Sequence, residues 1–233
     1  MKILTIIPAR GGSKGIPKKN LTLLDGIPLV SHAVHMAKKI SKLSDIFVST
    51  DSPEIASVVQ RMEVSVPFMR PSELSGDRVS DFEVIFHGLN AMERYNSLRY
   101  DYIIMLQPTS PLRTLEDINA CIDLLKSGTA DAVWTVTELD VKYHPLKQLF
   151  IRDDDNAELF DELGKNVIAR QQLKPSYIRN GACYGFSRDC IMKQRTIYGS
   201  KLRLITSKKT QISIDTVEDL NAAEIELKKR KYV

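Results

Sequence analysis

The sequence predicts one α/β domain with a doubly wound, mostly parallel sheet. Its 233 residues fit one large domain, or one domain with an insertion. The content of 43% hydrophobic and 27% charged residues is typical of a globular chain with a sizeable core. Short apolar runs alternate along the chain with segments of helical periodicity, and this alternation favours parallel strands joined by helices.

The chain opens on the apolar run 2–8, which is rich in isoleucine and predicts a buried parallel strand. A loop rich in Gly, Lys and Pro follows at 9–20. Apolar residues at helical spacing then predict a helix over 28–40. A second strand at 45–50 ends at an Asp-Ser-Pro turn, which is typical of a helix start and predicts a helix over 53–62.

The same alternation continues toward the middle of the chain. A short strand is predicted at 64–68 and a longer amphipathic helix at 77–95. The apolar runs 100–106 and 130–137 predict two further strands. Between them, a helix is predicted over 114–126, because a threonine N-cap precedes an acidic first turn.

The pattern stops from Glu138 to Arg179, where apolar runs are short and prolines are scattered. We interpret 139–179 as an insertion or small subdomain. Regular structure is predicted to resume in strands at 181–186, 202–205 and 212–214 and in a last helix at 216–229.

Charge and cysteine content limit the possible functions. A net charge of +4 suits an anionic ligand such as a nucleotide, but it is too small to indicate a nucleic-acid surface. No apolar run is long enough to span a membrane, and the N-terminus lacks the order of a signal peptide, so we expect a cytoplasmic protein. Cys121, Cys183 and Cys190 form no CxxC motif, so reduced thiols are expected.

The loop 9–20 is the first candidate site. It holds three glycines and four cations directly after a predicted strand. In open α/β sheets ligands bind beyond the carboxyl ends of the strands, and a cationic loop rich in backbone amides can hold a polyphosphate there. The loop contains neither the Walker A pattern nor GxGxxG. A solvated basic loop is the alternative interpretation.

Four motifs in order carry a resemblance to a known family. The motifs span nearly the whole chain. They are 7–17 (IPARGGSKGIP) with Lys19 and Asn20, 106–113 (LQPTSPLR), the pair 170–172 (RQQ) and 180–184 (NGACY), and 212–220 (ISIDTVEDL). Together they resemble the acylneuraminate cytidylyltransferases, the CMP-sialic acid synthetase family. That family includes enzymes for legionaminic and pseudaminic acid.

The resemblance implies a nucleotide-diphospho-sugar transferase-like fold and a cytidylyltransferase. In the implied reaction, CTP and a nine-carbon 2-keto sugar acid give the CMP-sugar and pyrophosphate. The anomeric hydroxyl makes an in-line attack on the α-phosphorus, and Mg²⁺ balances the charge. It also implies that 139–179 is a dimerisation segment with the sugar site near the interface of a homodimer.

The residues that match the family's site form three groups. Arg10, Lys14 and Lys19 can meet the triphosphate and the charge on the leaving pyrophosphate, and are the expected catalytic residues. The positions implied for nucleotide binding are Arg10, Gly11, Gly12, Ser13, Lys19, Asn20, Arg70 and Ser80. The positions implied for sugar binding are Gln107, Arg113, Arg170, Asn180 and Tyr184.

Four of the five sugar-site residues also have a plainer interpretation. Gln107 can be a strand-end residue, and Arg113 can pair with a local carboxylate. Arg170 suits the planar sugar carboxylate, but it can also be a solvated charge in the insertion. Tyr184 can be a core residue.

The metal site departs from the family pattern, which closes on two aspartates two residues apart. Here the first of them is Ser213, so only Asp215 can bind Mg²⁺, with phosphates and water as the other ligands. Asp215 can otherwise be a helix N-cap. This departure leaves two alternatives open: an enzyme of the same fold with a Kdo-type sugar or a phosphonate as acceptor, and a catalytically silent nucleotide-binding homologue.

Overall fold

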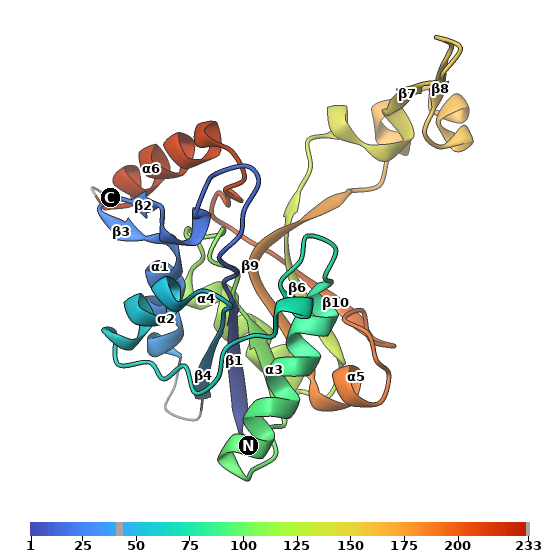
Figure 1. Ribbon diagram of the computed structural model, residues 1–233. Helices are drawn as coiled ribbons and strands as arrows, with labels where there is room; N and C mark the ends of the chain where they lie inside the picture. Colours follow the sequence, from blue (N-terminus) through green and yellow to red (C-terminus); the bar gives the residue numbers. More distant parts are fainter. Residues whose placement is uncertain (41–43, 232–233) are drawn as a thin grey trace.

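A six-stranded sheet lies at the centre of the computed structural model, which describes residues 1–40 and 44–231 (Figure 1). Its strand order is β10-β6-β9-β5-β1-β4. The strands are β1 (Ile3–Pro8), β4 (Ser44–Ser49), β5 (Tyr102–Met105), β6 (Ala132–Glu138), β9 (Tyr177–Ser187) and β10 (Leu202–Thr206). β1 pairs in parallel with β4 and β5, and β6 with β10, whereas β9 runs antiparallel between β5 and β6. The prediction of a mostly parallel sheet is confirmed.

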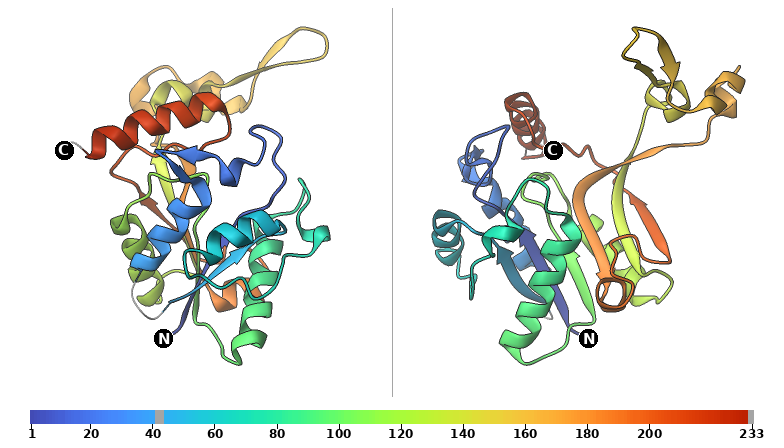
Figure 2. Two further views of the ribbon diagram at one scale, coloured as in Figure 1. Left: turned by 60° about the vertical axis from the view of Figure 1, so that its left-hand side comes forward. Right: turned by 45° about the vertical axis from the view of Figure 1, so that its right-hand side comes forward.

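Helices cover both faces of this sheet, as a doubly wound fold requires (Figure 2). They are α1 (Leu29–Lys39), α2 (Pro53–Gln60), α3 (Asp81–Asn96), α4 (Leu115–Lys126), α5 (Arg188–Met192) and α6 (Val217–Lys231). Helices α1, α2 and α4 contribute Val34, Ile55 and Ile122 to one core cluster, while α3 and α5 contribute Leu89 and Ile191 to a second.

A smaller cluster anchors the C-terminal helix. Ala223 of α6 packs with Leu24 and Leu29 beside the two-stranded hairpin of β2 (Leu23–Leu24) and β3 (Ile27–Pro28). None of the helices in residues 1–40 and 44–231 has the length and apolar character needed to cross a membrane. Cys121, Cys183 and Cys190 are buried free thiols, as predicted.

Side-chain caps fix where the central helices begin. Thr114 accepts a hydrogen bond from the backbone N–H of Asp117 in a capping box, and this predicted N-cap is confirmed. The same device places Ser80 before α3, where Ser80 and Glu83 cap each other. Helix α3 therefore begins at Asp81, not at Asp77 as predicted.

Two predicted strands are wrong. Residues 64–68 form no strand; Val64 and Val66 pack against a core cluster without pairing to β4, which remains the sheet edge. Residues 212–214 also form no strand, because Ile214 makes one backbone hydrogen bond, from its N–H to the Thr109 carbonyl, and buries its side chain beside α6. Both segments are apolar because they pack, not because they pair.

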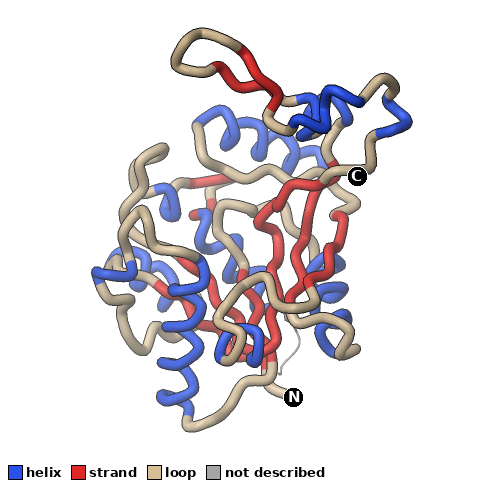
Figure 3. Tube along the Cα trace, turned by 90° about the vertical axis from the view of Figure 1, so that its right-hand side faces the viewer, coloured by secondary structure: helices blue, strands red, loops and turns tan. Residues whose placement is uncertain are grey.

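The predicted insertion takes the form of an arm that stands away from the sheet (Figure 3). We call residues 139–176 the projecting segment; β6 leads into it and β9 leads back. It holds the hairpin of β7 (Leu149–Ile151) and β8 (Ala157–Leu159) and several short 3₁₀ helices. Strand β9 begins at Tyr177, four residues before the strand predicted there.

Candidate active site

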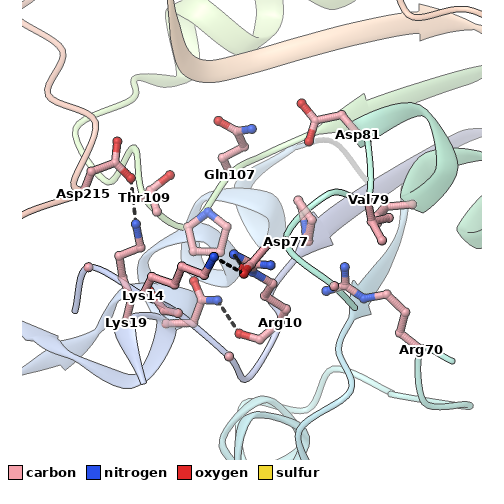
Figure 4. Close-up of a pocket in the computed structure, with 18 residues that line it drawn as sticks. Arg10, Lys14, Lys19, Arg70, Asp77, Val79, Asp81, Gln107, Thr109 and Asp215 are labelled. Atoms are coloured by element: carbon pink, nitrogen blue, oxygen red, sulfur yellow. Dashed lines mark hydrogen bonds and ion pairs between the residues drawn. The ribbon is translucent and has the colours of Figure 1, made fainter. Parts of the chain in front are cut away.

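A pocket of about 460 Å³ opens where β1 and β5 end, the edge at which the sequence placed the ligand (Figure 4). Four separate parts of the chain line it: the loop after β1, the loop before α3, the turn after β5, and Asp215 just before α6. Of the predicted site residues, those that line it are Arg10, Gly12, Ser13, Lys14, Lys19, Asn20, Arg70, Gln107 and Asp215.

Two cations of the pocket share one carboxylate. The Arg10 guanidinium lies 2.9 Å from one oxygen of Asp77, and the Lys14 ammonium lies 2.7 Å from the other. The hydrogen bond from Lys14 lowers the pKa of Asp77, with a further contribution from Arg10. Asp77 therefore lies as an anion between the two side chains that the sequence assigns to a triphosphate.

Lys19 meets the other carboxylate at this end of the pocket. Its Nζ lies 2.7 Å from Asp215 and donates a hydrogen bond of 3.1 Å to the Ile214 carbonyl. Gly15 brings the loop close to the same residue, because a Cβ at this position would lie 2.5 Å from the Asp215 carbonyl oxygen. The glycine thus lets the cationic loop pack directly against the predicted metal ligand.

Arg70 forms a buried wall of the pocket. Its side chain donates to the Ser49 carbonyl at 2.9 Å and to the Leu74 carbonyl at 3.4 Å. Its Nε is buried without a hydrogen-bond partner among the described residues. Burial lowers the pKa of Arg70. An arginine fixed in this way presents a preorganised positive charge to the pocket.

The other predicted nucleotide residues divide between lining and support. Gly12, Ser13 and Asn20 line the pocket, and the Asn20 amide also donates to the Arg10 carbonyl at 2.9 Å. Gly11 turns its N–H to Asp51 at 2.7 Å, and Ser80 uses its hydroxyl to cap α3. Neither of these last two lines the pocket, so their contact with a nucleotide stays a prediction.

Gln107 lines the pocket where β5 ends, on the side away from the lysines (Figure 4). The chain approaches it closely at Gly181, whose φ of +70° favours glycine and where a Cβ would lie 2.6 Å from Oε1 of Gln107. The NGACY motif therefore supports the position of Gln107 through its backbone.

Three other predicted sugar residues are buried and do not line the pocket. Arg113 donates to the carbonyls of Ala182 and Gln107, and burial lowers its pKa to about 10. The Asn180 amide oxygen accepts a hydrogen bond from Thr135 at 2.8 Å, and its nitrogen donates to Ser207 at 3.0 Å.

The third buried residue, Tyr184, accepts a hydrogen bond at its hydroxyl from the Gly181 N–H at 2.9 Å, and its ring packs on Trp134. These contacts hold β9 against its neighbours. Direct sugar binding by Arg113, Asn180 and Tyr184 stays a prediction.

Arg170 lies elsewhere. It begins a 3₁₀ helix, Arg170–Gln172, in the projecting segment, is exposed, and is not among the residues that line its own chain's pocket. Its contact with a sugar carboxylate therefore stays a prediction.

The sequence analysis did not identify two carboxylates of the pocket. Asp77 and Asp81 both line the pocket. They belong to a loop and a helix start that the sequence placed within one continuous helix. The Ser-x-x-Glu pattern at Ser80 and Glu83 could have located the true start of α3, and with it both carboxylates.

Metal-binding potential rests on few oxygen ligands. The described part of the chain contains no group of three or more His, Cys, Asp or Glu side chains placed to hold a metal ion. Asp215 lines the pocket, whereas the exposed Ser213 does not. One or two carboxylates with substrate phosphates and water are a common Mg²⁺ environment, so this set fits a magnesium ion that arrives with a nucleotide.

This arrangement is suited to transfer of a phosphoryl-type group. Four cations, three carboxylates and the neutral amides of Asn20 and Gln107 line the pocket, and no cysteine or serine nucleophile paired with a histidine lines it in residues 1–40 and 44–231. Charge neutralisation and positioning of two substrates are the chemistry that such a set can supply.

Comparison with known proteins agrees with this geometry. Residues 4–232 match the family model described as Cytidylyltransferase. Over 221 residues the chain is 32% identical to CMP-N,N'-diacetyllegionaminic acid synthase of Legionella pneumophila, which covers 94% of this chain and 93% of that protein. It is 31% identical over 223 residues to N-acylneuraminate cytidylyltransferase of Streptococcus agalactiae, but spans only 52% of that longer protein.

A solved structure shares the fold. The CMP:2-keto-3-deoxy-manno-octonic acid synthetase complexed with CTP superposes with a TM-score of 0.72 at 17% identity, covering 99% of this chain and 100% of that one.

Proposed function

This chain belongs to the cytidylyltransferase family, and from that premise we propose that it joins CTP to a nine-carbon 2-keto sugar acid, giving the CMP-sugar and pyrophosphate. The observation that carries the proposal is the pocket at the ends of β1 and β5, which is lined by Arg10, Lys14, Lys19 and Arg70 together with Gln107. Two relatives that match most of the chain are named CMP-N,N'-diacetyllegionaminic acid synthase and pseudaminic acid cytidylyltransferase.

The cationic end suits the nucleotide. Arg10, Lys14 and Lys19 bind the triphosphate, and in doing so exchange their present carboxylate contacts for phosphate oxygens. Arg70 adds a fixed charge, and Asn20 holds the loop in place through the Arg10 carbonyl. Because the charge on the leaving pyrophosphate grows during the reaction, these cations stabilise the transition state more than the ground state.

The reaction is a direct displacement. The anomeric oxygen of the sugar forms a bond to the α-phosphorus as the bond between that phosphorus and the bridging oxygen to the β-phosphorus breaks. The electron pair leaves with pyrophosphate. The protein's task is to hold the sugar hydroxyl in line with the breaking bond, and Gln107, fixed beside Gly181, is placed to orient the sugar.

We propose Mg²⁺ as the cofactor, with Asp215 as the protein ligand. When bound, the ion neutralises phosphate charge and polarises the α-phosphate. The support is the carboxylate donor of Asp215 in the pocket and its contact with Lys19, a residue assigned to the same phosphates. Before the nucleotide binds, the ion pair with Lys19 holds the Asp215 side chain toward the pocket.

We further propose a homodimer formed through the projecting segment. The support is the exposure of its large apolar side chains: Ile151 is 74% exposed, Phe160 69% and Ile168 92%. Large apolar side chains exposed on one segment in this way are typical of interfaces. Arg170 lies on the same segment, so a second chain is the route by which it would reach a sugar. We also propose a cytoplasmic location, supported by three cysteines that stay unpaired.

Pyrophosphate release tests the proposed function. The protein is incubated with CTP, Mg²⁺ and a panel of 2-keto sugar acids: neuraminic, legionaminic, pseudaminic, deaminated and Kdo. Release that depends on one nine-carbon acid establishes the activity and names the acceptor. If only Kdo supports pyrophosphate release, the acceptor is Kdo and not a nine-carbon acid. Silence with every acid, while CTP still binds, overturns the proposal in favour of a nucleotide-binding homologue without this activity.

A further inference from the structure

Three carboxylates line the pocket, and they differ in their partners. Asp77 lies between Arg10 and Lys14, and Asp215 lies against Lys19. Asp81 has neither a hydrogen bond nor an ion pair at its carboxylate in residues 1–40 and 44–231. Among the described residues, Asp81 is therefore the pocket carboxylate without an ion pair, while the other two each contact a cation.

Position separates Asp81 from the other two as well. It is the first residue of α3, fixed there by the capping box of Ser80 and Glu83. Its carboxylate points toward the side of the pocket that holds Gln107, whereas Asp215 lies with Lys19 on the other side (Figure 4). Asp81 thus faces the end assigned to the sugar, not the end assigned to the triphosphate.

The surroundings of Asp81 favour its protonated form, whereas those of Asp77 favour the anion. Burial raises the pKa of Asp81, and the charge of Arg179 on β9 opposes this rise only in part. Arg179 is stacked over the Trp134 ring, with its guanidinium carbon 5.1 Å from the ring centroid. The other titratable groups facing this part of the pocket are Tyr184 on β9 and, from the pocket walls, Arg70 and Asp77.

The reaction needs a group with these properties. The anomeric hydroxyl must lose a proton as it attacks phosphorus, and a carboxylate is the type of pocket side chain suited to accept it. Asp77 and Asp215 lie beside Lys14 and Lys19, the cations assigned to the triphosphate, whereas Asp81 faces the side of the pocket that holds Gln107 (Figure 4). A carboxylate whose pKa is raised toward the working pH is a better base.

We infer that Asp81 is the general base of the reaction, taking the proton of the acceptor hydroxyl as the oxygen–phosphorus bond forms. The inference rests on the proposed function. The proton passes from the anomeric oxygen to the Asp81 carboxylate, the electron pair of that O–H bond goes to the new bond to phosphorus, and pyrophosphate leaves with the pair of the broken bond. Asp81 returns its proton to water when the products depart.

The test compares Asp81→Asn and Asp81→Glu with the wild type. Asn keeps the size of the side chain but cannot accept the proton, so kcat should fall by about 100-fold to 10,000-fold. The dissociation constant of CTP, measured by calorimetry, should stay within about twofold, because the interaction lost belongs to the transition state. Glu restores a carboxylate and should recover a large part of kcat.

The pH profile separates a base from a structural residue. The wild-type kcat should fall at acid pH as Asp81 becomes protonated, and this limb should be absent from Asp81→Asn. Glu116→Gln is the matched control, since Glu116 is also an acidic residue in the first turn of a helix but lies outside the pocket. Its kcat and pH profile should equal those of the wild type.

Two kinds of failure are distinguishable. If the wild type releases pyrophosphate and Asp81→Asn keeps its kcat or its acid limb, or loses kcat and CTP affinity together, Asp81 is not the base and the proposed function stands. If the wild type is silent with every sugar acid, the proposed function fails, and the role of Asp81 fails with it.

Discussion

The body of the molecule and its projecting segment bury their apolar residues in opposite ways. In the body, side chains as large as Tyr100 and Phe186 are fully buried between the sheet and its helices. In the projecting segment, Ile151, Phe160 and Ile168 are mostly exposed. Burial of apolar surface is the main source of stability, so the body is stabilised within one chain, while the projecting segment would gain its burial from the second chain of the proposed dimer.

The comparison extends to chemistry. All the predicted phosphate-binding cations lie in the body, whereas Arg170 is the predicted site residue on the projecting segment. Variants in the body should therefore alter catalysis without altering association, whereas variants on the projecting segment should alter association and leave CTP binding unchanged.

The largest effect is expected from Asp215→Asn. Loss of the metal-ligating carboxylate should lower kcat by about 100-fold or more, which corresponds to about 3 kcal/mol of transition-state stabilisation. Melting temperature and sedimentation should not change, because Asp215 is exposed. Steady-state rates across a Mg²⁺ titration provide the measurement, and near-normal turnover would remove Asp215 from the metal role.

Lys19→Ala should weaken CTP binding by about 10-fold to 100-fold, the range expected for one lost charge-assisted hydrogen bond. The apparent affinity for the sugar should change less. Calorimetry with CTP and KM values for both substrates measure the difference. An effect confined to the sugar would place the loop after β1 at the wrong end of the pocket.

The projecting segment is tested by the double variant Phe160→Ser with Ile168→Ser. Sedimentation should show a dimer in the wild type and a shift toward monomer in the variant. The melting temperature of the body and its CTP affinity should hardly change, because substitutions at exposed sites usually alter stability by less than about 0.5 kcal/mol. A wild-type monomer would contradict the proposed dimer, and a variant that loses CTP binding would break the division between the two regions.

Asp77→Asn should have the smallest effect, and in the opposite direction. Removing the carboxylate that holds Arg10 and Lys14 frees both for phosphate, so CTP should bind up to about fivefold more tightly, in line with the modest strength of exposed ion pairs. Weaker CTP binding would instead show that Asp77 contacts the nucleotide or its metal.

The sequence was sufficient where a local pattern decides the structure. Apolar runs located β1 and β5, and the threonine before an acidic turn located the start of α4. It failed where burial and pairing look alike: residues 64–68 and 212–214 are apolar, but whether such a segment joins a sheet depends on which distant edge it meets. The sequence also did not predict that β9 runs antiparallel to β5 and β6.

The candidate site shows the same division. The motifs predicted that Arg10, Lys19, Gln107 and Asp215 belong to one site, and all four line the same pocket. The ion pairs of Asp77 with Arg10 and Lys14 join residues more than sixty positions apart, and no local pattern announces them.

Strand β9 also governs when the sheet can close. It lies between β5 and β6, yet it follows the whole projecting segment in the chain. During synthesis, β1, β4 and β5 can assemble early, but β6 has no neighbour through which to join them until residues 177–187 have left the ribosome. We therefore expect the two halves of the sheet to meet late, in a step limited by long-range contacts.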